Sequence, residues 1–247
     1  MSTTSRIASC GIGVGVALAL AGCSAPSKNA DSAAPKYLAT AVATSVHRGS
    51  LHVVDVTTNG GLVTTMTADL SESDSTETIK NSDGTGETDL TVTGGAAYVR
   101  ASPAVLQNIL ALTPAVAQQS AGAWIKVLKD DGPYSTIARA LTISAEISPY
   151  VPTPSTAVIG KERSVKGVTG MVVPVSGTYN ATGQATKIDA NVAVFVASGS
   201  GLIQGGSIAA KTGKTIERKY AVFTKWGDPV TLVAPSPTLS YRDLYNQ

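Results

Sequence analysis

The residues Leu20-Ala21-Gly22-Cys23 place a side chain that is suited to covalent chemistry, the thiol of Cys23, directly after two small residues. A cysteine thiol becomes a strong nucleophile when it ionises, and the small residues before it leave the backbone open to a peptidase. The preceding residues 7–20 are apolar and follow an N-terminus whose only charged side chain is Arg6. A basic start, an apolar stretch and small residues at a cut are typical of a bacterial export signal. The stretch is also short for a permanent membrane-spanning helix.

Cys23 directly after Leu-Ala-Gly is similar to the lipobox of bacterial lipoproteins. The resemblance implies that the thiol receives a diacylglyceryl group, that residues 1–22 are removed, and that Cys23 becomes the lipid anchor. We therefore expect a membrane-bound protein on the extracytoplasmic face of the cell membrane. Residues 23–36, rich in Ser, Ala, Pro and Asn, are expected to form a flexible tether. The alternative is a plain cleavable signal in which the cysteine is a coincidence.

The remaining sequence shows no pattern of catalytic residues. His47 and His52 are the only histidines, and their spacing is not that of a His-Glu-x-x-His zinc site. A Gly-x-Ser-x-Gly nucleophile turn is absent, because Gly199-Ser200-Gly201 lacks the spacing, and no phosphate-binding glycine loop of the Walker type occurs. We expect neither enzyme activity nor a metal or other cofactor.

The composition favours a β-rich body with an unusual interior. Apolar residues make up 43% of the chain, yet it contains only two Phe and two Trp, so Val, Ala, Leu and Ile must form the core. Cys10 leaves with the signal, and the mature chain would have no disulfide. The net charge of +2 argues against nucleic-acid binding. The composition leaves the oligomeric state open.

Turn residues divide the body into about eleven expected strands. Asn59-Gly60-Gly61 and residues 82–86 predict two hairpins, and Gly94-Gly95 a further turn. The expected strands cover residues 51–57, 62–70, 76–81, 87–93, 96–100, 124–128, 157–163, 168–176, 186–197, 202–210, 215–223 and 230–233. Helices are expected at 37–47, after Ser102-Pro103 with a break near Pro114, and at 134–147. Helices grouped within a series of strands predict an α+β fold around a large antiparallel sheet, forming one domain over residues 37–247.

The two mid-chain helical segments carry the candidate ligand-binding residues. Their apolar faces present five large side chains: Leu106, Ile109, Leu110, Ile137 and Leu141. If the sheet leaves its concave side unfilled, these residues line a pocket for acyl chains. The alternative is that they form ordinary core.

Two groups of charges are expected on the surface. Seven acidic residues fall between Asp69 and Asp89 and predict a solvated hairpin. Lys211, Lys214, Arg218 and Lys219 are expected to form a small solvated basic patch; the functional alternative is contact with an anionic membrane.

Trp226 is expected to pack at a strand end.

The order of these elements resembles the mycobacterial LppX/LprG type of lipoprotein, which has a LolA-like fold. The resemblance covers roughly residues 37–237 and rests on Gly95-Ala96-Ala97-Tyr98-Val99-Arg100, Gly122-Ala123-Trp124-Ile125-Lys126-Val127 with Ala140-Leu141, and Lys225-Trp226-Gly227-Asp228-Pro229-Val230 before Ala234-Pro235. It implies a strongly curved antiparallel half-barrel with helices covering the concave side. It also implies a lipid or glycolipid cargo in the cell envelope.

Two functions follow as hypotheses. The first is a lipid-anchored protein that binds or carries lipids. The second is a non-carrier interaction or scaffold lipoprotein whose half-barrel is filled by its own side chains, because a fold does not fix a function. A void of several hundred Å³ would favour the first.

Overall fold

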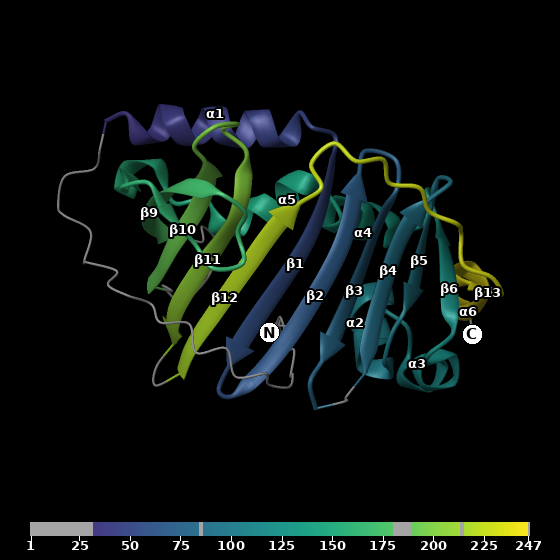
Figure 1. The fold of residues 1–247 in the computed structure, drawn as a ribbon. Helices are drawn as coiled ribbons and strands as arrows, with labels where there is room; N and C mark the ends of the chain where they lie inside the picture. The colour runs from purple at the N-terminus through teal and green to yellow at the C-terminus, as the bar shows by residue number, and fades with distance from the viewer. Residues whose placement is uncertain (1–31, 84–85, 180–188, 213–214, 247) are drawn as a thin grey trace.

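Thirteen strands form one sheet in the computed structural model, which describes residues 32–83, 86–179, 189–212 and 215–246. One half is an antiparallel meander of β1 (Ser50–Asn59), β2 (Leu62–Ser71), β3 (Ser75–Asn81), β4 (Glu87–Thr93), β5 (Ala96–Arg100) and β6 (Trp124–Leu128). The other half is a meander of β9 (Met171–Tyr179), β10 (Asp189–Ala197), β11 (Ile203–Thr212) and β12 (Thr215–Thr224). β12 pairs with β1, so these two strands join the halves in the middle of the sheet (Figure 1).

Short strands complete the sheet at its edges. β7 (Val158–Ile159) and β8 (Arg163–Ser164) both pair with β9, and β13 (Thr238–Ser240) runs parallel to β6. Edge strands this short offer few unpaired backbone groups to another chain. Thirteen strands stand against the eleven or so that were expected. Among the twelve expected segments, 157–163 and 168–176 give three strands instead of two, and 230–233 gives none, while β13 at Thr238–Ser240 was not expected.

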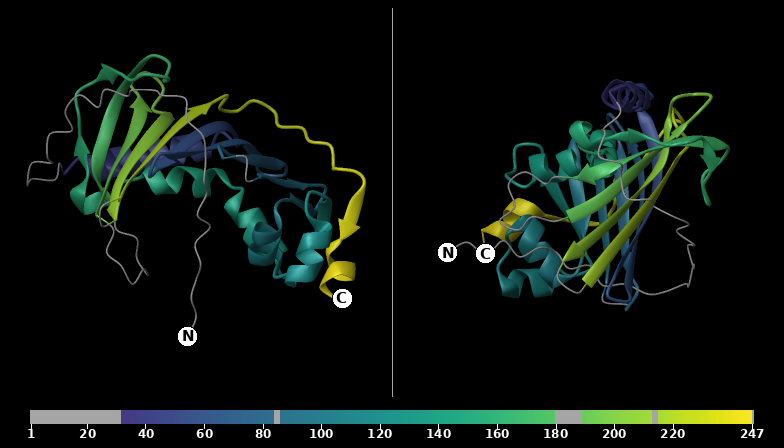
Figure 2. Two further views of the ribbon diagram at one scale, coloured as in Figure 1. Left: turned by 90° about the horizontal axis from the view of Figure 1, so that it is seen from below. Right: turned by 90° about the vertical axis from the view of Figure 1, so that its left-hand side faces the viewer.

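The sheet is strongly curved and open, and helices cover its concave side (Figure 2). These helices are α2 (Pro103–Leu110), α3 (Pro114–Ser120), α4 (Tyr134–Ala140) and α5 (Ile143–Ile147), followed by the 3-10 turns η1 (Ser148–Tyr150) and η2 (Pro154–Thr156). Side chains alternate between the two faces of a strand, and on β1 this alternation buries Leu51, Val53 and Asp55 beneath the helices. The predicted α+β half-barrel is confirmed.

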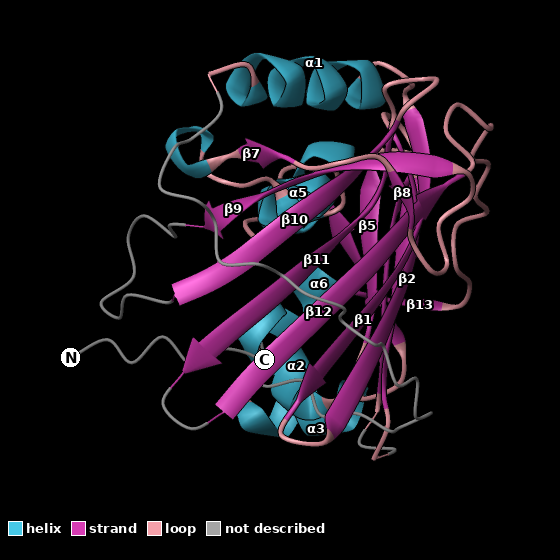
Figure 3. Ribbon diagram, turned by 60° about the vertical axis from the view of Figure 1, so that its left-hand side comes forward, coloured by secondary structure: helices cyan, strands magenta, loops and turns pink. Residues whose placement is uncertain are grey.

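Helix α1 (Ala34–Val46) lies across one end of the strands (Figure 3). Leu38, Ala41 and Ser45 are buried at spacings of three and four residues, which place them on one helical face. The hydroxyl oxygen of Ser45 also accepts a hydrogen bond of 2.9 Å from the backbone N–H of Ile203 on β11. This buried bond fixes α1 on the sheet.

Two predicted elements are wrong. Residues 230–233 do not form a strand. Between Pro229 and Pro235 the chain crosses along the strand ends from β12 to β13, leaving Val233 90% exposed (Figure 1). The helix predicted over 134–147 is two helices, because Thr142 is extended and its hydroxyl caps α5 by accepting from the N–H of Ala145.

The expected break near Pro114 is confirmed. Ala111 ends α2 in the left-handed conformation, and Pro114 begins α3 behind the capping hydroxyl of Thr113. Trp226 packs after the end of β12 as expected. Its indole N–H donates to the carbonyl of Ile203 at 2.9 Å, and its ring meets Phe223 edge-on.

Cys23 and the predicted signal lie outside the described residues, and α1 begins at Ala34 within the segment expected to form the tether. The short helix α6 (Tyr241–Tyr245) ends the described chain. No helix in the described part of the chain combines the length and the apolarity needed to cross a bilayer.

Candidate functional site

The five predicted pocket residues lie in or against the packed core on the concave side. Leu106 and Leu110 on α2 are fully buried, and Ile137 and Leu141 are almost so. Ile109 is half-buried and packs against the same cluster. The sheet and its helices therefore fill this part of the concave side. Of the five, Leu141 also borders one of two hollows beside α5.

Two hollows lie beside α5. Two adjoining spaces, of about 380 and 300 Å³, flank this helix, and Ser144 lines both of them. We call them together the α1–α5 groove, because Val42 and Val46, one turn apart on α1, line one space each. Ser144 is exposed, and the described structure shows no hydrogen bond from its hydroxyl.

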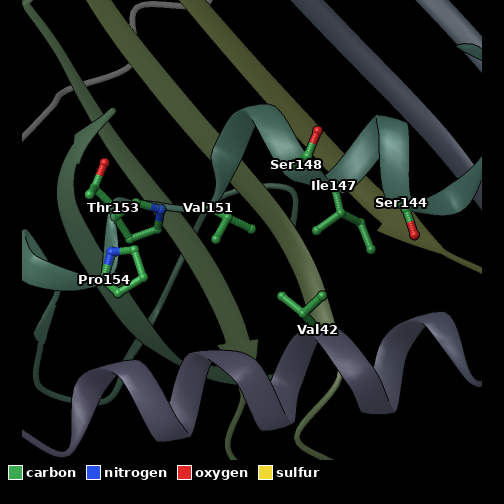
Figure 4. A pocket seen from close by; sticks show the side chains of 8 residues that line it. Val42, Ser144, Ile147, Ser148, Val151, Thr153 and Pro154 are labelled. Atoms are coloured by element: carbon green, nitrogen blue, oxygen red, sulfur yellow. The ribbon is translucent and has the colours of Figure 1, made fainter. Parts of the chain in front are cut away.

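The larger space is the apolar hollow. Val42 from α1 and Ile147 from α5 line it, together with Val151 after η1 and Pro154 at the start of η2 (Figure 4). Pro152 completes the apolar lining. Ser144, Ser148 and Thr153 contribute the remaining lining, and no charged side chain takes part. A space of this size and lining falls at the small end of ligand pockets and suits a single alkyl chain.

The smaller space is the polar hollow. It lies where the β2–β3 and β4–β5 turns approach the junction of α4 and α5. Its apolar floor includes Val92 and Leu141. Its rim carries hydroxyl groups and one carboxylate, from Ser71, Glu72, Ser73, Ser75, Tyr134, Thr142 and Ser144. The groove as a whole is thus amphipathic, with an apolar end and a polar end.

A buried group of charges holds η1 on the concave face. Asp55 on β1 is 2% exposed, and its carboxylate forms an ion pair of 3.0 Å with the ammonium of Lys219 on β12. The same carboxylate accepts a hydrogen bond from the Tyr150 hydroxyl, and Lys219 lies 5.6 Å from the centre of the Tyr150 ring. Burial, together with the Asp55 charge, raises the pKa of Tyr150, which keeps its hydroxyl a donor.

Two further carboxyl groups face this cluster. Glu77 on β3 is 9% exposed, and burial raises its pKa to about 7 even though Lys219 opposes the shift. Burial likewise raises the pKa of Glu146 on α5 to about 7, and the charge of Glu77 adds to this effect. Both carboxyl groups are therefore substantially protonated near neutral pH.

Tyr150 also packs directly on a glycine. A methyl group at Gly206 on β11 would lie 2.5 Å from the Tyr150 ring, which is closer than real contacts allow. The ring also meets Phe223 edge-on at 5.7 Å, and its hydroxyl donates to Asp55, so these contacts restrict any shift of the ring. Glycine at this position is therefore required for η1 to reach the sheet.

Replacing Gly206 by alanine should accordingly lower the free energy of unfolding by about 1–3 kcal/mol. Urea denaturation measures the change. Gly199→Ala is the matched control, because nothing lies within 4 Å of a methyl group there. Equal stability of the two variants would contradict the close packing of Tyr150 on Gly206.

The sequence misplaced several charged residues. Glu77 and Asp89 belong to the stretch predicted to be a solvated hairpin, yet both are buried, and Asp89 pairs with Arg100 at 2.7 Å. Lys219 was predicted to share a surface patch, but it turns inward to Asp55 while Arg218 is exposed. Lys214 lies outside the described residues. Successive side chains of a strand point to opposite faces of the sheet, and this alternation could have predicted that Arg218 and Lys219 lie on different faces.

Comparisons with known proteins give limited information. No protein-family model matches the chain, and no curated protein is similar to it. Among solved structures, one of MucB is 14% identical with a TM-score of 0.43 and covers 83% of this chain. A MucA/MucB complex from Pseudomonas aeruginosa is 13% identical with a TM-score of 0.40 and covers 78% of it.

The chain spans only 64% and 57% of the length of those two chains. With TM-scores this low, the function must be argued from the residues of this chain alone. The resemblance to the LppX/LprG type stays a prediction.

Proposed function

We propose that this protein is a lipid-anchored lipoprotein on the extracytoplasmic face of the cell membrane, and that it binds an acyl chain of an envelope lipid in the α1–α5 groove. The observation that carries the proposal is the apolar hollow of about 380 Å³ next to a polar one. The anchor rests on the Leu-Ala-Gly-Cys motif at Cys23. Membership of the LppX/LprG type, with a lipid or glycolipid as cargo, belongs to the same proposal.

The lining of the groove suits reversible binding. Burying one methylene gains about 0.8 kcal/mol, both in a bilayer and in an apolar groove. Moving a chain from the membrane into the apolar hollow is therefore close to neutral in free energy. A protein that takes up and releases lipids needs this balance.

Lipid that co-purifies with the protein tests the proposal. The full chain with Cys23→Ser carries no anchor lipid of its own, so any lipid that mass spectrometry finds in its extract is bound non-covalently. We expect stoichiometric acyl lipid in this protein. A Ser144→Trp substitution should remove the lipid, because an indole at this exposed position occupies the junction of the two hollows.

Val233→Trp is the control for the Ser144 variant. Val233 is 90% exposed and lies on the crossing segment, outside the lining of the groove. This variant should keep its lipid, and thermal unfolding should show that both variants are folded. An extract of the Cys23→Ser protein that contains no lipid would refute lipid binding.

A second candidate is an interaction lipoprotein that carries no lipid. It is favoured by the burial of Leu106, Leu110 and Ile137, which form ordinary core on the concave side, as the alternative interpretation of these residues expected. Cross-linking in intact cells distinguishes the two functions. Capture of one envelope protein, with the same yield for the Ser144→Trp variant and with no lipid in the extract, is the result expected for this second function.

A further inference from the structure

We infer that the polar hollow binds a primary ammonium group of an amphiphile whose alkyl chain lies in the apolar hollow. This inference rests on the proposed function and names the head group that the groove selects. The inference follows from the donor and acceptor sites of the rim residues that are not yet used in hydrogen bonds.

Four of the six rim hydroxyls have already used their protons, and in the described structure Tyr134 and Ser144 show no hydrogen bond from theirs. Ser71 donates to the carbonyl of Asp74 at 2.7 Å, Ser75 donates to the carbonyl of Ser71 at 3.2 Å, and Thr142 donates to the carbonyl of Arg139 at 3.1 Å. Each of these three oxygens also accepts one backbone N–H. A hydroxyl oxygen has two lone pairs, so each has one acceptor position left and no donor.

Two other polar groups of the rim, Ser73 and Glu72, favour the same ligand. Ser73 donates to the side chain of Asp74 at 3.0 Å, which leaves its oxygen as an acceptor. Glu72 is exposed, and its carboxylate, a group with acceptor sites only, borders the hollow. No Lys or Arg lines either hollow. The rim therefore offers mostly acceptors and a negative charge.

A primary ammonium group complements this rim. It has three N–H donors, no acceptor and a positive charge. A phosphate or carboxylate head group has acceptors only, so it could pair with the hydroxyls of Tyr134 and Ser144 but would leave the other rim acceptors unpaired and would face the charge of Glu72. A hydroxyl head group has a single donor and no charge. Because Ser144 lines both hollows, the same molecule can place its chain and its ammonium group in the two adjoining spaces.

Three single-chain probes with the same alkyl length test the inference. Dodecylamine, dodecanol and dodecanoate are titrated at pH 7, below their aggregation limits, into the full chain with Cys23→Ser, and calorimetry measures Kd. At this pH the amine is protonated and the carboxylate is ionised. We expect dodecylamine to bind at least about threefold more tightly than dodecanol, in the range of an exposed ion pair, and dodecanoate to bind most weakly.

The second measurement is the affinity of a variant that lacks the charge of Glu72. Glu72→Gln should reduce the affinity for dodecylamine about threefold and leave that for dodecanol unchanged. Glu162→Gln is the matched control, since Glu162 is also exposed and lines neither hollow. The Ser144→Trp variant should bind none of the three probes, which locates the binding in the groove.

The outcomes separate this inference from the proposed function. Equal affinity for all three probes, tightest binding of dodecanoate, or an unchanged dodecylamine affinity in Glu72→Gln would overturn the ammonium site and leave acyl-chain binding intact. Failure of every probe to bind would overturn the proposed function itself. Tight binding of dodecylamine that depends on Glu72 supports both.

Discussion

Replacing Lys219 by methionine should lower the free energy of unfolding by about 3–5 kcal/mol. The ammonium of Lys219 is the only cation within reach of the Asp55 carboxylate among the ion pairs of the described residues, at 3.0 Å. Methionine keeps most of the volume and leaves a carboxylate that is 2% exposed without its counter-charge. Urea denaturation at pH 7 measures the loss. Lys211→Met, at an exposed position of β11, should change stability by less than about 0.5 kcal/mol.

The double variant Asp55→Asn/Lys219→Met identifies the cause. If the loss comes from an unpaired buried charge, removal of that charge should restore much of the stability, because apolar or neutral replacements of a buried pair are often tolerated. The Tyr150 hydroxyl keeps an acceptor in the asparagine side chain. A double variant as unstable as Lys219→Met alone would show that packing of the lysine stem, and not charge pairing, is what stabilises η1 on the sheet.

The sheet was predictable because its signals are local. Asn59-Gly60-Gly61 forces a hairpin, since Gly60 and Gly61 have φ values of +59° and +90° that disfavour other residues. Once β1 and β2 are in register, alternation fixes which side chains face the helices. The helix break near Pro114 was predictable in the same way, since proline is tolerated at the start of a helix and not in its interior. Each of these signals lies within a few residues of the structure it predicts.

The candidate site was not predictable in the same way. The α1–α5 groove lies between helices about a hundred residues apart in sequence, and its hollows depend on how η1 is seated against β1 and β12. The five apolar residues named from helical periodicity were correctly placed on inner faces. Periodicity cannot distinguish a side chain that fills the concave side from one that lines a void. Glu77 was misplaced because the excess of acidic residues around it suggested solvent, whereas its position on β3 turns it inward.

The buried carboxyl groups predict an unusual pH dependence: the protein should be more stable at pH 5 than at pH 8. Burial raises the pKa of Glu77 from its ordinary value of 4.5 to about 7, and that of Glu146 shifts in the same direction. The folded state therefore binds more protons than the unfolded state between about pH 4.5 and 7, so stability falls as the pH rises through this window. For Glu77 alone the loss is about 3 kcal/mol, since one pKa unit corresponds to about 1.4 kcal/mol.

Glu77→Gln isolates this contribution, because the amide has nearly the shape of the protonated carboxyl group and does not titrate. Compared with the parent protein, the variant should unfold at a higher temperature at pH 8, by roughly 6–12 °C for a chain of this size, and should differ little at pH 5. Removing the Glu77 charge also removes a cause of the raised Glu146 pKa, so part of the remaining pH dependence should decrease as well. Glu162→Gln, at an exposed position, should follow the parent at both values of pH. A Glu77→Gln variant whose unfolding temperature follows the parent from pH 5 to pH 8 would mean that Glu77 is ionised at little cost in the folded protein, with Lys219 and not protonation compensating its burial.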